Sequence, residues 1–268
     1  MALLAALMAA ATLPGFTPFA TGPDGGAVLT GTFPGAAWPG YVYLPPGYSR
    51  EHRYPVVYLL HGMPGSPSEY LDGTNLAPFA DAAISSGRLR PFIAVLPAAG
   101  VDPKYDGEWA GRWEREVVDD VVPFVDAHLG TVATPRGRVL AGLSAGGFGA
   151  VYIALRHPGV FGAVESWSGY FHPLRDGPFR DDTNAQLRTN DPRALARSEG
   201  AVLRGDGTRF FLSSGPYHSH WFKPAETRTF AATLRRLGLP VRTLFTSSLK
   251  GEWRTQFDAG LTWALQRQ

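Results

Sequence analysis

The sequence predicts an α/β protein with a mostly parallel, doubly wound sheet flanked by helices. Short apolar runs alternate with amphipathic helical segments along the chain, and no internal repeat is visible. The length of 268 residues and the hydrophobic fraction of 44% are sufficient for one large core. We expect a single domain over 27–268, preceded by a signal-like or flexible segment over 1–26.

The order of elements supports this fold class. Residues 27–33 and 41–44 predict two early strands, and the nearly continuous apolar run 54–60 is typical of a central strand covered on both faces. The polar segment 169–200 predicts a cap-like insertion over the strand ends. Further strands are expected at 91–96, 139–141, 160–167, 209–212 and 240–246, and helices at 75–86, 113–129, 148–156, 192–197, 224–237 and 254–266.

Composition excludes several classes of partner. The net charge is only +2 and no basic cluster is present, so neither nucleic acid nor an anionic membrane surface is indicated. With no cysteine, the chain has no disulfide, thiolate nucleophile or thiolate metal site. We expect a small-molecule ligand and no stable membrane insertion, and the sequence does not indicate an oligomeric state.

The first residues resemble a targeting segment. Residues 1–13 form an apolar run too short to span a bilayer, although no positive residue precedes it. Few lysines together with abundant Ala, Gly and Pro indicate a GC-rich bacterial genome. We expect an exported, extracellular bacterial protein, with a cytoplasmic protein as the alternative.

The segment Gly137–Ala150 carries the main chemical motif. An apolar run leads directly into Gly-Leu-Ser-Ala-Gly with Ser144 at its centre, and a helical segment follows. A serine on such a sharp turn exposes its hydroxyl at a helix N-terminus, where free N–H groups favour a developing oxyanion. Glycines must flank it because a side chain would collide with the neighbouring strand or helix. The alternative is a glycine-rich turn that only permits close packing.

A second motif, His61-Gly62-Met63-Pro64-Gly65, follows the strand 54–60. Turns of this type supply one oxyanion N–H, and the residue after the nucleophile supplies the other. We therefore expect the backbone amides of Met63 and Ala145 to form an oxyanion hole. For His61 we expect a structural role, in which the ring holds the loop by hydrogen bonds.

These two motifs, the run RHPGVFGAV and the W-x-x-x-F start of the last helix together resemble one family over 41–265. It is the esterase family that includes S-formylglutathione hydrolase, feruloyl esterases and mycolyltransferases. The resemblance implies an α/β-hydrolase fold, Ser144 as nucleophile of a Ser–His–acid triad, acyl transfer from an ester to water or an alcohol, and no cofactor.

Two positions of the family's triad are not matched. The acid is expected in the loop after the strand 209–212, which here contains His218 and His220 and no carboxylate. The histidine is expected where Gly251 stands, immediately before Glu252 and Trp253. In an exchanged triad, His220 or His218 would be the base and Glu252 the orienting acid, because triads are defined by geometry and not by chain order. Glu165 is a reserve candidate for the acid.

Two other interpretations remain open. A degenerate site would leave a pseudoenzyme that binds a saccharide or acyl ligand without turnover. The pair His218 and His220 could bind a metal, with His172 as a candidate further ligand. Because no clear third ligand is present, we expect no metal site. Whether the protein is an enzyme or only binds a ligand, we expect three tryptophans to line the ligand site: Trp109, Trp221 and Trp253. We also expect the acidic side chains of the helix 113–129, including Glu114 and Glu116, to be solvated.

Overall fold

The computed structural model describes residues 13–100, 108–216, 224–247 and 252–266. Within these residues one sheet of nine strands has the order β1-β2-β3-β5-β4-β6-β7-β8-β9. The first three strands form an antiparallel meander, and every pair from β5–β4 to β8–β9 is parallel. The strands are β1 (Phe16–Thr21), β2 (Ala27–Gly31), β3 (Gly40–Leu44), β4 (Val56–Leu60), β5 (Ile93–Leu96), β6 (Arg138–Leu143), β7 (Ala163–Trp167), β8 (Arg209–Ser214) and β9 (Val241–Phe245).

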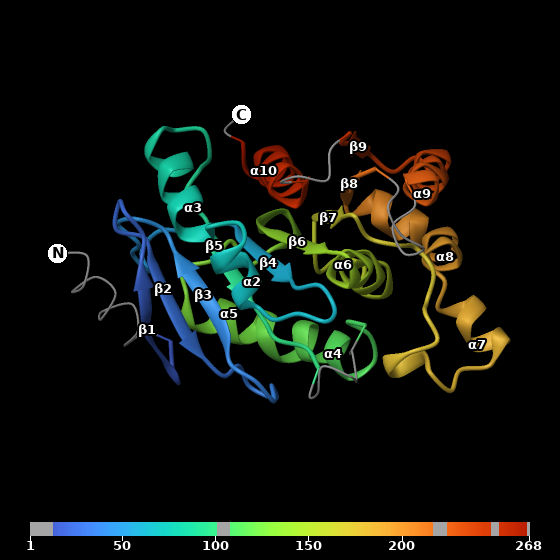
Figure 1. Cartoon of the computed structure of the whole chain (residues 1–268), viewed down its shortest axis with the longest axis horizontal. Helices are drawn as coiled ribbons and strands as arrows, with labels where there is room; N and C mark the ends of the chain where they lie inside the picture. Colours follow the sequence, from blue (N-terminus) through green and yellow to red (C-terminus); the bar gives the residue numbers. More distant parts are fainter. Residues whose placement is uncertain (1–12, 101–107, 217–223, 248–251, 267–268) are drawn as a thin grey trace.

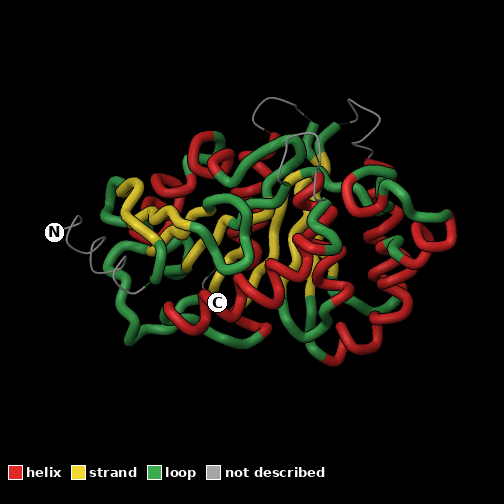
Figure 2. Tube along the Cα trace, turned by 90° about the horizontal axis from the view of Figure 1, so that it is seen from below, coloured by secondary structure: helices red, strands yellow, loops and turns green. Residues whose placement is uncertain are grey.

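Helices cover both faces of this sheet (Figures 1 and 2). On β4, Val56, Tyr58 and Leu60 belong to the core on one face, whereas Val57 and Leu59 belong to the core on the other. α5, α6, α8 and α9 contribute to the first core, and α3 and α10 to the second. The helices are α2 (Ser68–Asp72), α3 (Leu76–Ser85), α4 (Arg112–Arg115), α5 (Val122–His128), α6 (Ala145–Arg156), α7 (Asn184–Thr189), α8 (Pro192–Gly205), α9 (Pro224–Arg236) and α10 (Glu252–Leu265).

The predicted α/β fold with a mostly parallel sheet is confirmed, with differences in detail. The sheet begins at Phe16, inside the segment 1–26 that we expected to be signal-like or flexible. The short helix expected at 192–197 continues to Gly205, and α2 is not indicated by the sequence pattern. The predicted helix 113–129 is interrupted by a π-helical stretch, Glu116–Val121, between α4 and α5.

The expectation of a solvated acidic face on this helix is wrong for two residues. The Glu114 side chain is 4% exposed and accepts hydrogen bonds from Arg156 Nε at 2.6 Å and from the backbone N–H of Gly111. His157 Nε2 lies 2.8 Å from the same carboxylate. Glu116 is also buried, and burial raises its pKa to about 7. The sequence pattern shows the charges but not the segments that pack over them.

Candidate active site

Ser144 stands between the carboxyl end of β6 and the first residue of α6. Its φ of 55° and ψ of −117° lie in a region that non-glycine residues seldom adopt. The N–H of Ser144 donates to Trp167 O at 2.9 Å, which ties the strained turn to the end of β7. A residue of this kind is held in place by its surroundings, as a nucleophile elbow requires.

The glycines around Ser144 are required by close backbone contacts. A Cβ added to Gly146 would lie 1.9 Å from Leu60 O, and one added to Gly142 would lie 2.3 Å from the backbone of Gly146. The predicted collision with the neighbouring strand and helix is therefore confirmed. A Cβ on Gly62 would lie 3.5 Å from the Ser144 Cβ, so the loop after β4 passes directly beside the serine.

The two predicted oxyanion amides lie at this turn and loop. Ala145 is the first residue of α6, and Met63 follows Gly62 in the loop. Neither backbone N–H donates a hydrogen bond to another residue in the described part of the chain. Within the described residues, one unused donor thus follows Ser144 directly and the other lies in the loop after β4.

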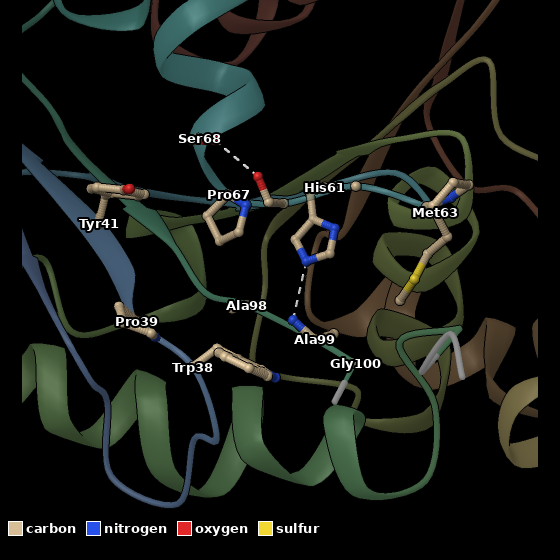
Figure 3. A pocket seen from close by; sticks show the side chains of 13 residues that line it. Trp38, Pro39, Tyr41, His61, Met63, Pro67, Ser68, Ala98, Ala99 and Gly100 are labelled. Atoms are coloured by element: carbon tan, nitrogen blue, oxygen red, sulfur yellow. Dashed lines mark hydrogen bonds between the residues drawn. The ribbon is translucent and has the colours of Figure 1, made fainter. Parts of the chain in front are cut away.

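His61 has the structural role that we predicted. Its ring is buried, and Nε2 accepts a hydrogen bond from the N–H of Ala99 at 3.1 Å (Figure 3). Nδ1 lies 2.8 Å from Gly62 O. Since Nε2 is an acceptor here, the proton resides on Nδ1 and is donated to Gly62 O. Burial lowers the pKa of His61 to about 4, despite the opposing hydrogen bond to Gly62.

Trp109 supports the same loop and does not form an open wall of the site. Its side chain is 1% exposed, and its indole N–H donates to His61 O at 2.9 Å. Trp253, also predicted as a wall, packs so tightly on the end of α2 that a Cβ on Gly73 would lie 1.8 Å from its ring. Trp221 lies outside the described residues.

An open cleft of about 650 Å³ adjoins the oxyanion loop (Figure 3). Trp38, Pro39 and Tyr41 line it from the β2–β3 connection and β3, and Met63 and Pro67 line it from the loop after β4. Trp38 is 51% exposed and belongs to none of the motifs that predicted the site. The local signal that could have identified it is a loop tryptophan followed directly by proline, Trp38-Pro39.

The candidate histidines and the candidate carboxylate of the exchanged triad fall outside what the structure describes. This holds for His218, for His220 and for the side chain of Glu252. The structure does describe the residues that adjoin these two segments. Gln256 Oε1 accepts a hydrogen bond from Ser213 Oγ at 2.6 Å, and Gln256 Nε2 donates one to Ser168 Oγ at 2.9 Å. Ser168 Oγ also accepts from the N–H of Gly215. The loop that carries both histidines therefore starts in contact with the helix that begins at Glu252.

One histidine–carboxylate pair at this edge of the sheet was missed. His172, which the sequence suggests only as a candidate metal ligand, has Nδ1 at 2.7 Å from Glu226 Oε1, and the N–H of Phe171 donates to the same oxygen at 3.0 Å. Burial would raise the pKa of Glu226, but the His172 hydrogen bond, the Phe171 amide and the Arg193 charge lower it. The reserve acid Glu165, in contrast, lies within β7 and faces Gly260 of α10.

The chain is similar to known esterases. The chain is 33% identical over 164 residues to an endo-1,4-beta-xylanase/feruloyl esterase of Xylanibacter ruminicola, covering 58% of this chain and 21% of that protein. It is 32% identical over 141 residues to the esterase Rv1288 of Mycobacterium tuberculosis, covering 50% of this chain and 30% of that protein. The chain thus spans less than a third of the length of these curated relatives.

Solved structures show the same fold. A ferulic acid esterase superposes with a TM-score of 0.73 at 20% identity, over 93% of this chain and 96% of the other. An S-formylglutathione hydrolase from Agrobacterium tumefaciens superposes with a TM-score of 0.68 at 17% identity, over 92% and 97%. A family model described as "Putative esterase" matches residues 34–258, which is most of the chain. The chain belongs to this esterase family and has the α/β-hydrolase fold.

Proposed function

We propose that the chain is a serine carboxylic-ester hydrolase, or an acyltransferase, that acts through an acyl-enzyme on Ser144. One observation carries the proposal: Ser144, strained at φ 55°, directly precedes the Ala145 amide and adjoins the loop that carries the Met63 amide, and neither amide donates a hydrogen bond among the described residues. A strained nucleophile with preorganised donors next to it is the arrangement that stabilises a tetrahedral oxyanion.

The chemistry then follows from these groups. Ser144 Oγ attacks the ester carbonyl carbon while a base removes its proton, and the carbonyl oxygen becomes an oxyanion facing the two amides. Collapse of the intermediate expels the alcohol, which takes the proton, and leaves the acyl-enzyme. Water or an acceptor alcohol then attacks the acyl carbon and gives its proton to the base, and the base returns a proton to Ser144 Oγ as the acyl–oxygen bond breaks and the product leaves.

For the base we propose His220, with His218 as the alternative, and for the orienting acid Glu252. The hydrogen bonds among Ser168, Ser213 and Gln256 support this assignment, because they fix the start of the histidine loop against α10. Arrival of the base from a separate loop is compatible with triad chemistry on other folds. His172, which is paired with Glu226, is another histidine near this end of the sheet, so its variants are the comparison for the assignment of the base.

The cleft supports an uncharged, largely apolar substrate. None of the described residues that line it carries a charge, since His61 is neutral above about pH 4. Prolines, alanines and the exposed Trp38 make up much of its lining, and serine hydroxyls supply polar groups beside the oxyanion loop. Since one relative is named a feruloyl esterase and a solved neighbour holds ferulic acid, we propose esters of aromatic acids as substrates.

The direct test is hydrolysis of aromatic-acid esters by purified wild type and Ser144→Ala. We expect turnover by wild type and a loss of at least about 1,000-fold in the variant, the scale of losing a triad member. Turnover unchanged in Ser144→Ala would refute a nucleophilic serine. Aliphatic esters of similar size serve as the substrate control.

A pseudoenzyme that binds a saccharide or acyl ligand is the second candidate function. The observation that favours it is that the Ser144 hydroxyl has no hydrogen-bond partner among the described residues. If wild type hydrolyses no ester but binds aromatic acids in the cleft, as judged by calorimetry and lost in Trp38→Ala, this candidate replaces the enzyme.

We also propose export, on the basis of the apolar run at 1–13. In the part of the chain that the structure describes, every helix is too short or too polar to cross a bilayer. Secretion of the full chain from a bacterial host with loss of its first residues, read by intact mass, is the expected outcome. A cytoplasmic protein of full mass would contradict it.

A further inference from the structure

A second concave site lies at the amino-terminal ends of the parallel strands, whereas Ser144 lies at their carboxyl ends. Its cavity of about 790 Å³ forms where β6, β7 and β8 begin, beside the turn after α8 and the last turn of α10. Ser144 follows the other end of β6, a six-residue strand, so roughly 20 Å of strand separates the two sites. The cavity is therefore independent of the ester chemistry.

Three guanidinium groups and a single carboxylate line this cavity among the described residues. They belong to Arg90, Arg136, Arg209 and Asp206, and the other lining residues are uncharged. Three positive charges and one negative charge leave the lining with a net charge of +2. The described lining of this cavity is therefore locally positive.

Arg209 is fixed in place by its neighbours. Its two terminal nitrogens donate to Trp263 O at 3.3 Å and to Ala264 O at 3.1 Å, at the end of α10. The guanidinium carbon also lies 4.1 Å from the centre of the Trp263 ring. Arg209 therefore presents a positive charge in a fixed orientation on one wall of the cavity.

The side chains of the other two arginines have no partner among the described residues. In the described parts of the chain, no acceptor or carboxylate binds the side chain of Arg90 or of Arg136. Burial lowers the pKa of Arg209, and the nearby charge of Arg90 lowers it further, so these two like charges repel each other. The buried Glu165 carboxyl opposes this lowering of the Arg209 pKa, and burial raises the pKa of Glu165 itself to about 8.

We propose that this arginine pocket binds a doubly charged oxyanion group, either free phosphate or sulfate or a phosphate monoester carried on a small molecule. A dianion matches the net charge of +2 on the lining. Guanidinium groups match the geometry of phosphate and sulfate oxygens through paired N–H donors. The ring of Trp263 gives the pocket an apolar floor beside the charged wall.

The test is isothermal titration of the full chain with inorganic phosphate, sulfate and glycerol phosphate at constant ionic strength, with chloride as the control anion. We expect saturable binding of phosphate or sulfate that becomes about tenfold weaker in Arg90→Gln and in Arg136→Gln, the scale of one charged hydrogen bond. Binding of inorganic phosphate alone identifies the free ion, and equal binding of glycerol phosphate identifies a carried group.

Two further variants make the result specific. Asp206→Asn removes the one carboxylate among the described lining residues, so we expect phosphate to bind about threefold tighter. Arg115→Gln removes an exposed arginine of α4 that does not line the pocket, and its affinity is expected to equal that of wild type. Phosphate and sulfate binding no better than chloride, or affinities unchanged in all three pocket variants, would overturn the proposal.

Discussion

The imidazole of His61 and the backbone amide of Ala99 are joined by a hydrogen bond of 3.1 Å. This bond connects the loop after β4 to the end of β5, and the second ring nitrogen closes the loop on Gly62 O. Both nitrogens of a neutral ring are thereby used. The histidine next to the oxyanion loop thus fixes the backbone and is not available as a base.

We predict that His61→Ala lowers kcat for ester hydrolysis by about 100-fold without changing the pH dependence of kcat above pH 6. The loss follows from displacement of the Met63 amide, since misplacing an oxyanion donor costs this much. Steady-state kinetics between pH 6 and 9 provide the measurement, with the exposed His52→Ala as control. A shifted pH profile would instead indicate a base.

Gly146→Ala should destabilise the fold by at least about 3 kcal/mol, because the new methyl group would lie 1.9 Å from Leu60 O. Gly205→Ala is the matched control. Nothing lies within 4 Å of its added Cβ, and Gly205 ends α8, so we expect a gain of about 0.5–1 kcal/mol. Urea unfolding of both variants measures the difference, and equal effects would contradict the packing described here.

The pH dependence of stability should change in Glu165→Gln. Burial raises the pKa of Glu165 from 4.5 to about 8, so between these values the folded chain holds a proton that the unfolded chain has lost. This group therefore makes wild type less stable as pH rises from about 5 to 8, by at most about 1.4 kcal/mol per pH unit. Glu165→Gln removes the effect. Its stability relative to wild type should increase over this range, as measured by urea unfolding; parallel curves would contradict the assignment.

Trp38→Ala should reduce kcat/KM for aromatic-acid esters by about tenfold and affect small aliphatic esters little, because one exposed aromatic wall of the cleft is lost. Val202→Ala is the control. Val202 is 50% exposed on α8 and does not line the cleft. Equal losses for both variants, or for both classes of ester, would place the substrate elsewhere.

Much of the fold could be predicted because its determinants are local. Periodic apolar runs predict the strands β4 to β9, and the glycines around Ser144 predict the turn. The role of His61 followed from its place at a strand end. β1 was missed because its exposed outer residues lack an alternating pattern.

The remainder of the site depends on contacts between distant segments. Trp109 and Trp38 are both loop tryptophans, and only packing decides that the first is buried against His61 and the second lines the cleft. The His172–Glu226 contact joins residues 54 positions apart. No local pattern reports such a pair, and for the same reason the sequence predicts a base, His220 or alternatively His218, without showing which ring would face Ser144.

The most direct test of the central claim is the rate of fluorophosphonate labelling, read by intact mass. We predict rapid single labelling of wild type and none in Ser144→Ala. The labelling rate should collapse in one of the two single variants His220→Ala and His218→Ala, and also in the single variant Glu252→Gln. His172→Ala should label at the rate of wild type. Collapse in His172→Ala and Glu226→Gln alone would assign the base to that pair instead. No labelling of wild type would contradict an activated Ser144 and leave the elbow as architecture only.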